Sequence, residues 1–270
     1  MLHAWLRPAP SAVPVVTDPR ERRGLGIEIT VVLLVTLGSS GLRSLVSLLD
    51  SLASTVPLAQ QTVAINVPQA RAGYLDLVGQ LLSVTRLLAW GALGVFLLWR
   101  GASGTPRFTL ASLGIDRTRP ARDGTWGAGL AALIGIPGLG LYLVARAAGL
   151  NLDVAPSTLN SAWWTVPVLV LSAAANAWAE EALVVAYLLT RLRQLGVGEN
   201  GSLLAAALLR GSYHLYQGFG GFVGNVVLGL VFGRLWQRTN RLWPLVVAHT
   251  IIDVVAFVGY ALLAPHVSWL

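Results

Sequence analysis

The sequence predicts an all-α fold: a polytopic transmembrane helical bundle of about seven spans, with eight as the alternative count. Among its 270 residues, 55% are hydrophobic and only 11% are charged, and the mean hydropathy is +0.67. Soluble domains carry about a quarter charged residues, so most of this surface is expected to face lipid. Apolar runs close to the roughly 20 residues that a membrane-spanning helix needs recur along the chain.

These apolar runs define the expected elements in order. The loops between them are rich in proline, glycine and polar residues, and none is long enough for a soluble domain. We expect a cytoplasmic tail (1–24), N-terminal transmembrane helices (25–148), a C-terminal transmembrane core (149–263) and a short tail (264–270). The expected spans are 26–50, 73–99, 125–147, 162–190, 201–217, 222–238 and 242–263, of which the fifth and sixth are short.

The distribution of arginine predicts the orientation in the membrane. All 19 basic residues are Arg, and seven spans with the N-terminus inside would place 14 of them in inside segments and two in outside segments. Basic residues favour the cytoplasmic side. We therefore expect a multi-pass protein of a bacterial cell membrane, with a cytoplasmic N-terminus and an external C-terminus. The net charge of +7 is explained by this topology, and no nucleic-acid partner is expected.

The sequence argues against several kinds of site. The chain has no Cys, which excludes disulfides and thiolate metal sites. It also lacks the HExxH pattern of a zinc protease helix. A GxSG pattern around Ser40 lies in the first expected span, far in sequence from any candidate His. Its small residues fit helix packing, as do the pairs Gly220/Gly224 and Gly229/Gly233.

Ionisable side chains within the C-terminal spans are the main functional signal. Each costs about 2.5–3.5 kcal/mol on insertion scales, and such residues usually face a bundle interior or a water-filled cavity. With a rise of about 1.5 Å per residue, the acidic and His members would lie at a similar depth, roughly 12–21 Å from the inner ends of their spans. The residues concerned are Glu180, Glu181, Arg210, His214, His249 and Asp253.

The two adjacent carboxylates are expected to differ in role. Neighbouring helical residues point about 100° apart, so Glu180 and Glu181 cannot face one point equally. Asn176 precedes Glu180 by one turn on the same polar stripe. Glu180 is therefore the expected cavity-facing carboxylate, with Glu181 as its partner, and a carboxylate in such a site is a suitable general base for water. The alternative is a buried structural pair.

Two further pairs have the i, i+4 spacing that places both side chains on one helical face. Arg210 precedes His214, and His249 precedes Asp253. Imidazoles in such a site can assist a base, stabilise an oxyanion or bind a metal. Together with the carboxylates they suit amide hydrolysis, whereas taken singly each pair also fits a structural role.

The order of these motifs resembles the CAAX-processing and bacteriocin-processing (CPBP, or ABI) family of intramembrane endopeptidases. The resemblance covers about residues 160–262. It consists of an EE pair, a His on the next helix and an HxxxD pattern on a later helix, here Glu180–Glu181, His214 and His249–Asp253. The resemblance implies an all-α membrane fold around a conical cavity that opens toward the cytosol.

The resemblance also implies roles for individual residues. Glu180 would activate water with the assistance of His214, and His249 and Asp253 would form the oxyanion-stabilising pair. The family is described both as glutamate-dependent and as metal-dependent. A divalent metal such as zinc, if present, would be held by Glu180, His214 and His249. The expected partners are the lipid bilayer and a membrane-associated protein or peptide substrate.

Three positions depart from the family pattern. Val185 stands where the first motif has Arg, Arg210 stands where the second has Phe, and Asp253 stands where Asn is common. We hypothesise that Arg210 supplies the positive charge that is missing at position 185, because it lies one turn from His214.

Two other functions are compatible with these residues. One is a catalytically inactive scaffold, or an immunity-type or regulatory relative that kept the cavity. The other is a small-solute or proton transporter that uses Glu180, His214 and His249 as a relay. The retained acidic and His set favours the endopeptidase over the scaffold, and the lack of evident inverted repeats argues against the transporter.

Overall fold

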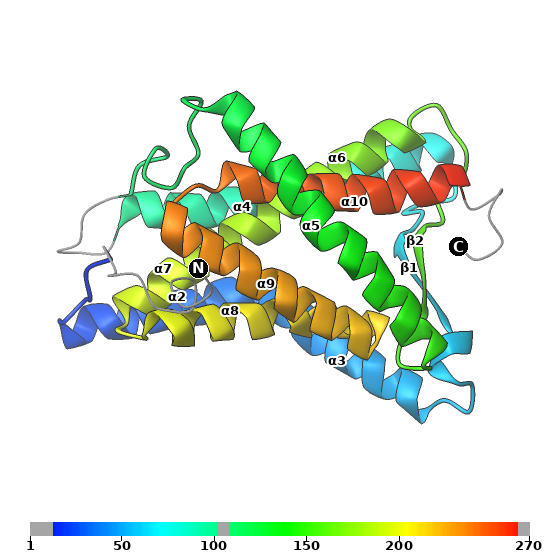
Figure 1. Ribbon diagram of the computed structural model, residues 1–270, viewed down its shortest axis with the longest axis horizontal. Coiled ribbons are helices and arrows are strands. Elements are labelled where there is room, and N and C mark those ends of the chain that lie inside the picture. The colour runs from blue at the N-terminus through cyan, green and yellow to red at the C-terminus, as the bar shows by residue number, and fades with distance from the viewer. Residues whose placement is uncertain (1–12, 102–107, 264–270) are drawn as a thin grey trace.

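Residues 13–101 and 108–263 are described by the computed structural model, and they form a bundle of long helices (Figure 1). The predicted all-α fold is confirmed. Residues 1–12 of the predicted N-terminal tail and all of the predicted C-terminal tail lie outside the described residues. The longer helices are α2 (Pro19–Val35), α3 (Leu37–Ala53), α4 (Gly73–Arg100), α5 (Pro120–Ala147), α6 (Thr165–Glu180), α8 (Glu199–Ser212), α9 (Phe219–Thr239) and α10 (Trp243–Leu263). The short elements are η1 (Leu58–Gln60), β1 (Thr62–Asn66), β2 (Asp153–Ser157), the π-helix η2 (Glu181–Leu188), α7 (Leu189–Gln194) and η3 (Leu215–Gln217).

Each expected apolar run contains a helix, but the span count differs from the prediction of seven. Among the described residues, five helices are long and apolar enough to cross a membrane, and the bent pair α2–α3 would make a sixth. The fifth expected run forms α8, which has only 14 residues. That length corresponds to about 21 Å, short of the roughly 30 Å hydrocarbon core. The chain leaves the helix after Ser212 and turns through η3 into α9.

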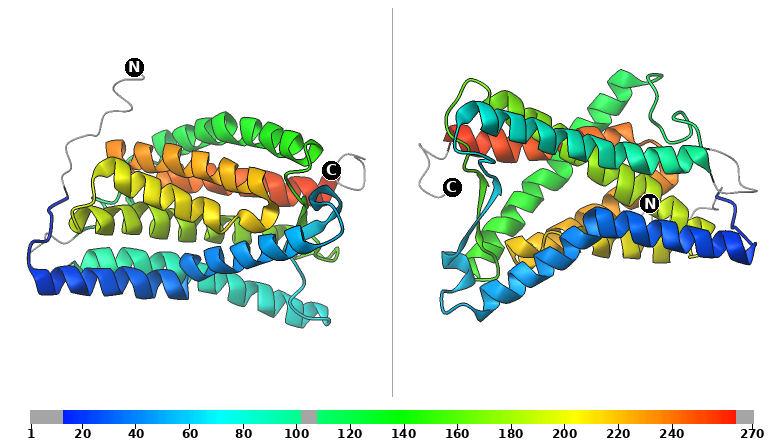
Figure 2. Two further views of the ribbon diagram at one scale, coloured as in Figure 1. Left: turned by 90° about the horizontal axis from the view of Figure 1, so that it is seen from below. Right: turned by 180° about the vertical axis from the view of Figure 1, so that it is seen from behind.

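The helix ends gather at two opposite ends of the bundle (Figures 1 and 2). One of them, which we call the basic end, holds the start of α2, the end of α4, the start of α5 and the α7–α8 and α9–α10 connections. Twelve arginines of the described part of the chain lie in these segments or within a few residues of them: 20, 22, 23, 100, 117, 119, 122, 191, 193, 234, 238 and 241. The opposite end, the strand end, carries Arg71 and Arg146. The arginine asymmetry read from the sequence is therefore present in three dimensions.

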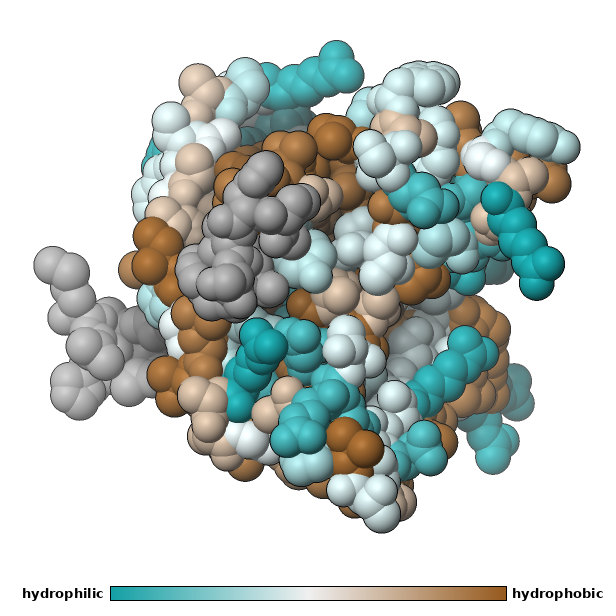
Figure 3. Space-filling model, turned by 90° about the vertical axis from the view of Figure 1, so that its right-hand side faces the viewer, coloured by the Kyte–Doolittle hydropathy of each residue, from teal (hydrophilic) through white to brown (hydrophobic). Residues whose placement is uncertain are grey.

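A two-stranded parallel sheet joins two segments that were expected to be loops. β1 pairs with β2 in the register Thr62↔Asp153, and Asp153 also forms an ion pair with Arg146 at 3.2 Å. Strands of five residues that pair across some ninety positions leave little periodic signal in a sequence. The pairing fixes both connections at the strand end, where Figure 3 shows hydrophilic side chains distributed among hydrophobic ones.

The first span is broken at Thr36. The axes of α2 and α3 differ by 50°, and the Thr36 hydroxyl donates to the Val32 carbonyl at 2.6 Å. Gly38 and the two serines that follow it are typical of such a kink. The Ser40 hydroxyl donates back to the Thr36 carbonyl at 3.4 Å, and a Cβ on Gly41 would meet the Ser212 hydroxyl. This segment packs helices together, as the sequence predicts.

The continuous helix formed by α6, η2 and α7 is the centre of the bundle. In its apolar window 67% of the residues are buried, against 17–33% for the other four candidate spans. The outer helices instead expose large apolar side chains, such as Leu82 on α4 and Ile136 on α5. An apolar exterior around a buried helix that carries carboxylates is the arrangement expected of a protein in lipid.

Small residues bring α9 close to its neighbours, which confirms the packing role predicted for Gly220, Gly229 and Gly233 but not for Gly224. A Cβ on Gly229 would lie 2.9 Å from the Ala207 Cα on α8, and one on Gly220 would lie 2.6 Å from the Ala145 Cβ on α5. A Cβ on Gly224 would lie 3.4 Å from the Leu141 side chain, an ordinary contact.

We expect Gly229→Ala to destabilise the protein by about 1 kcal/mol or more, because the new methyl group would meet backbone on the facing helix. Gly224→Ala is the matched control on the same helix. It should be neutral, or stabilising by up to about 1 kcal/mol through helix propensity. Thermal unfolding in detergent measures both, and equal midpoints for the two variants would contradict the close α8–α9 contact.

Candidate active site

The ionisable residues that the sequence places within the C-terminal spans lie close together at one point inside the bundle. They come from the junction of α6 and η2, from the end of α8 and from the middle of α10. Glu180 lies about 22 Å along the axis from the start of α6 and about 21 Å from the end of α7, by the helical rise. We call Asn176, Glu180, Glu181, Arg210, Tyr213, His214, His249 and Asp253 the Glu–His cluster.

Arg210 occupies the centre of this cluster. Its guanidinium is completely buried and forms ion pairs with both Glu180 and Glu181, with 3.2 Å between Arg210 Nη2 and Glu180 Oε2. Arg210 Nη2 also lies 3.3 Å from His249 Nδ1. Buried charges persist only when they are paired, and here one cation is shared by two carboxylates. The pairing of Arg210 with the Glu pair agrees with our hypothesis, while its equivalence to a missing Arg at position 185 stays a prediction.

The two adjacent carboxylates both reach this guanidinium, although neighbours on an α-helix diverge. The helix changes from α to π geometry between Glu180 and Glu181, and a forked guanidinium offers several donors. Glu181 is fully buried, and its Oε1 lies 2.8 Å from His249 Nδ1. Glu181 is therefore a direct contact of both Arg210 and His249.

Tyr213 belongs to the cluster but was missed in the sequence. Its hydroxyl donates to Glu180 Oε2 at 2.7 Å, so Arg210 and Tyr213 hold the same carboxylate oxygen. The only signal was an aromatic residue beside His214, and a buried Tyr hydroxyl generally needs a partner.

His214 lies beyond the C-terminus of α8, so the expectation that it shares a helical face with Arg210 was wrong. Its backbone dihedrals are φ −108° and ψ 3°, outside the α-helix. The chain turns here so that α9 can return along α8, and Gly218, at φ 106°, completes the turn. The His214 ring still reaches the cluster, with Nε2 at 4.0 Å from Glu180 Oε1 and Nδ1 at 3.4 Å from the Gln217 amide nitrogen.

His249 lies between two carboxylates. Its Nδ1 contacts Glu181, and its Nε2 lies 3.5 Å from Asp253 Oδ2 one turn later on α10. Asn176, predicted as a supporting residue, donates its side-chain amide to the same Asp253 oxygen at 3.0 Å. The predicted polar stripe of α6 thus orients the predicted pair of α10.

The donor set does not fit a bound metal. The part of the chain that the structure describes contains no group of three or more His, Asp or Glu side chains placed to hold a metal ion. In the conditional set of Glu180, His214 and His249, the Arg210 guanidinium already lies against Glu180 Oε2 and His249 Nδ1, so a metal bound there would lie close to a buried positive charge. We therefore assign no step to a metal.

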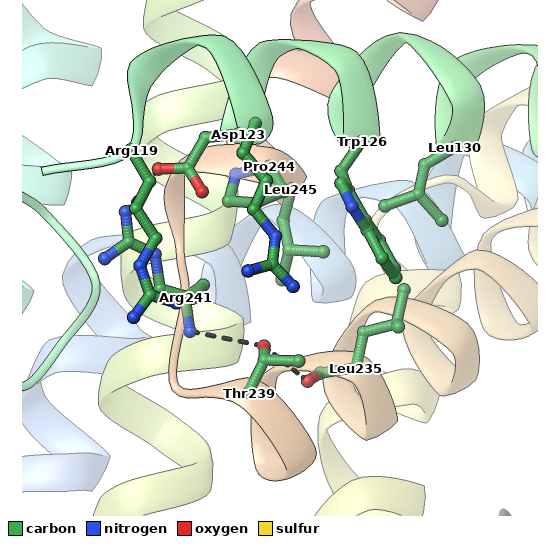
Figure 4. Close-up of a pocket in the computed structure, with 10 residues that line it drawn as sticks. Arg119, Asp123, Trp126, Leu130, Leu235, Thr239, Arg241, Pro244 and Leu245 are labelled. Carbon is green, nitrogen blue, oxygen red and sulfur yellow. Dashed lines mark hydrogen bonds and ion pairs between the residues drawn. The ribbon is translucent and has the colours of Figure 1, made fainter.

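The cluster is closed on most sides. His214 and Asp253 keep only 16% and 15% of their side-chain surface accessible, and Asn176 is also only partly exposed. One groove lies instead at the basic end between α5, α9 and α10 (Figure 4), and a shallower one beside it is lined by α5 alone. Neither includes a residue of the cluster. The conical cavity implied by the family resemblance stays a prediction.

Comparison with known proteins gives one family. Residues 162–255 match the family model described as "Type II CAAX prenyl endopeptidase Rce1-like". Searches of curated proteins and of solved structures gave no match. The matched segment contains the whole Glu–His cluster, and the match supports a CAAX-type intramembrane protease role in general. The resemblance to the CAAX-processing (CPBP) family is thus confirmed over residues 162–255, the segment that carries the cluster.

Proposed function

We propose that this protein is an intramembrane endopeptidase that hydrolyses peptide bonds of membrane-associated or lipid-proximal proteins. One observation carries the proposal: Glu180 Oε1 and His214 Nε2 face each other at 4.0 Å. His214 Nε2 is buried and has no hydrogen-bond partner within the described residues, and the hydrogen bonds of Glu180 there all go to Oε2. A water molecule bonded to both atoms would be held against a general base.

The surrounding contacts support Glu180 as that base. Arg210 and Tyr213 occupy Oε2 and so direct Oε1 toward His214. If the Gln217 amide donates to His214 Nδ1, as its 3.4 Å contact suggests, the ring proton is on Nε2 and points toward the water. In this mechanism Glu180 takes a proton from the water, the hydroxide adds to the peptide carbonyl, and Glu180 then delivers the proton to the leaving amine.

His249 is assigned to the oxyanion. Its two ring nitrogens face the carboxylates of Glu181 and Asp253, an arrangement that favours the doubly protonated imidazolium. The proton on Nε2 is then available to the carbonyl oxygen of a substrate. Asp253 acts through His249 and is itself held by Asn176. This arrangement explains how an Asp can stand where Asn is common, because its carboxylate need not contact the oxyanion.

The position of the cluster supports substrates near lipid. It lies midway between the two ends of the bundle, so the peptide bond to be cleaved has to reach the interior of the membrane. We assign the basic end to the cytoplasmic side, since basic residues favour that side.

The test compares peptide termini in membranes that contain the wild type, Glu180→Gln or the control Glu21→Gln. Glu180→Gln preserves size and removes the base, so it should reduce new termini by at least about 100-fold. Glu21 lies in the first turn of α2 at the basic end, and its variant should match the wild type. Identical termini in all three samples, with equal amounts of folded protein, would reject the protease and favour the inactive scaffold.

A further inference from the structure

A groove at the basic end combines exposed arginines with an apolar floor. It lies where the start of α5, the end of α9 and the start of α10 meet, and its volume is about 240 Å³ (Figure 4). Arg119, the N-cap residue of α5, lines it together with Arg122, Trp126 and Leu130 of α5, which are spaced by four residues. Residues at this spacing share one helical face. Along that face the side chains change from charged to aromatic to aliphatic within about 12 Å of helical rise.

Arg119 and Arg122 are free to bind an anion. Both are exposed, and neither forms an ion pair or side-chain hydrogen bond with another described residue. The third arginine of the groove, Arg241, is already paired with Asp116 and Asp123. Hydrogen bonds from Thr118 and the contact with Arg241 hold the pKa of Asp116 at about 2, so this pair stays charged at physiological pH.

Arg241 adds a further donor to the groove. Its Nε atom is buried and has no hydrogen-bond partner among the residues that the structure describes. Buried donors of this kind are rarely left unpaired, so an acceptor from outside the chain is expected nearby.

The remaining lining fits the interface between headgroups and acyl chains. Trp126 is about half exposed, and an indole at the end of a transmembrane helix favours that zone. A second shallow groove continues from Trp126 and Leu130 to Gly129 on the lipid-facing side of α5. The volume is below the roughly 300–1,000 Å³ of small-molecule pockets, so it suits a headgroup whose acyl chains remain outside.

We propose that this groove binds the phosphate headgroup of an anionic phospholipid, with Arg119 and Arg122 on the headgroup and with Trp126 and Leu130 along the first part of an acyl chain. Basic pockets between transmembrane helices bind anionic headgroups through the same chemistry. The site is separate from the Glu–His cluster, so it does not depend on the proposed protease activity.

The test uses phosphatidylglycerol with a photoreactive group in one acyl chain, and phosphatidylcholine with the same chains, in nanodiscs that contain the full chain. Cross-links are mapped by mass spectrometry. We expect residues 119–130 to be labelled by the anionic lipid at least about tenfold more than by the zwitterionic one. The double variant Arg119→Gln/Arg122→Gln should remove this preference, and Arg119→Lys/Arg122→Lys should retain most of it.

The matched control is Arg20→Gln/Arg23→Gln, which removes the same charge from the exposed start of α2. That segment lies at the same end but on the opposite side of the bundle from α5 (Figure 2). Its labelling should equal that of the wild type. Equal labelling by the two lipids, or the same loss in the α2 control, would overturn the proposal. Loss of labelling on addition of millimolar inorganic phosphate would also overturn it, by assigning the groove to a free anion.

Discussion

Arg210→Ala is expected to abolish proteolysis and to destabilise the protein by about 3–5 kcal/mol. The guanidinium is fully buried and is shared by Glu180 and Glu181, so its removal leaves two carboxylates facing each other with no cation between them. It also frees Glu180 Oε2, which fixes the direction of the proposed base. Thermal unfolding in detergent and the appearance of new peptide termini in membranes measure the two effects separately.

Matched variants separate the charge from the packing of this side chain. Arg43→Ala removes an exposed arginine from α3, another apolar helix, and should leave both measurements unchanged. Arg210→Met/Glu181→Gln removes the cation together with one carboxylate, and it should recover much of the stability but none of the activity. If Arg210→Met alone were as stable as the wild type, the buried ion pair would not be contributing as the structure indicates.

The link between Arg210 and position 185 has its own test. If Arg210 replaces a cation that the family carries four residues after the second Glu, then Arg210→Ala with Val185→Arg should restore part of the lost activity. Val185 is buried on η2, one turn beyond Glu181, so the new side chain starts close to the carboxylates. Failure of this rescue, in a variant that folds, would remove the idea of an exchanged cation.

Arg191→Ala is expected to produce a loss of stability of similar size, about 3–5 kcal/mol, without touching the Glu–His cluster. Arg191 is fully buried, and its Nε lies 2.8 Å from Glu28 Oε1 on α2. Its Nη2 donates to the Leu97 carbonyl on α4 at 2.7 Å. Tyr187 donates to the same Glu28 oxygen at 3.0 Å. One side chain thus ties α2 and α4 to the central helix.

The matched control for this effect is Arg100→Ala, which removes an exposed arginine at the end of α4. It should shift the unfolding midpoint little, since exposed charges contribute less than about 1 kcal/mol. Glu28→Gln/Arg191→Met should be more stable than Arg191→Ala, because no unpaired charge remains. Equal midpoints for Arg191→Ala and Arg100→Ala would contradict a structural role for this ion pair.

The sequence by itself determined the fold class, the approximate position of each helix and most of the candidate site. Helical apolar runs and charges within them are local properties, and the insertion cost of Glu180, His249 and Asp253 makes them conspicuous without any structure. The i, i+4 spacing also predicted that Asn176 and Glu180 share one helical face and that His249 and Asp253 share another. The hydrogen bond from Asn176 to Asp253 joins these two faces in the structure.

Only the tertiary structure decided which groups share a partner. Three contacts join segments that are distant along the chain: the ion pairs of Arg210 with the two Glu residues, the hydrogen bond of Tyr213 to Glu180, and the β1–β2 pairing. The break that places His214 outside α8, and the length that leaves α8 too short to span, follow from how α9 folds back on it. The periodicity of apolar residues predicts which face of a helix is buried. It does not predict which helix packs on that face, because this depends on how side chains distant in the sequence fit together.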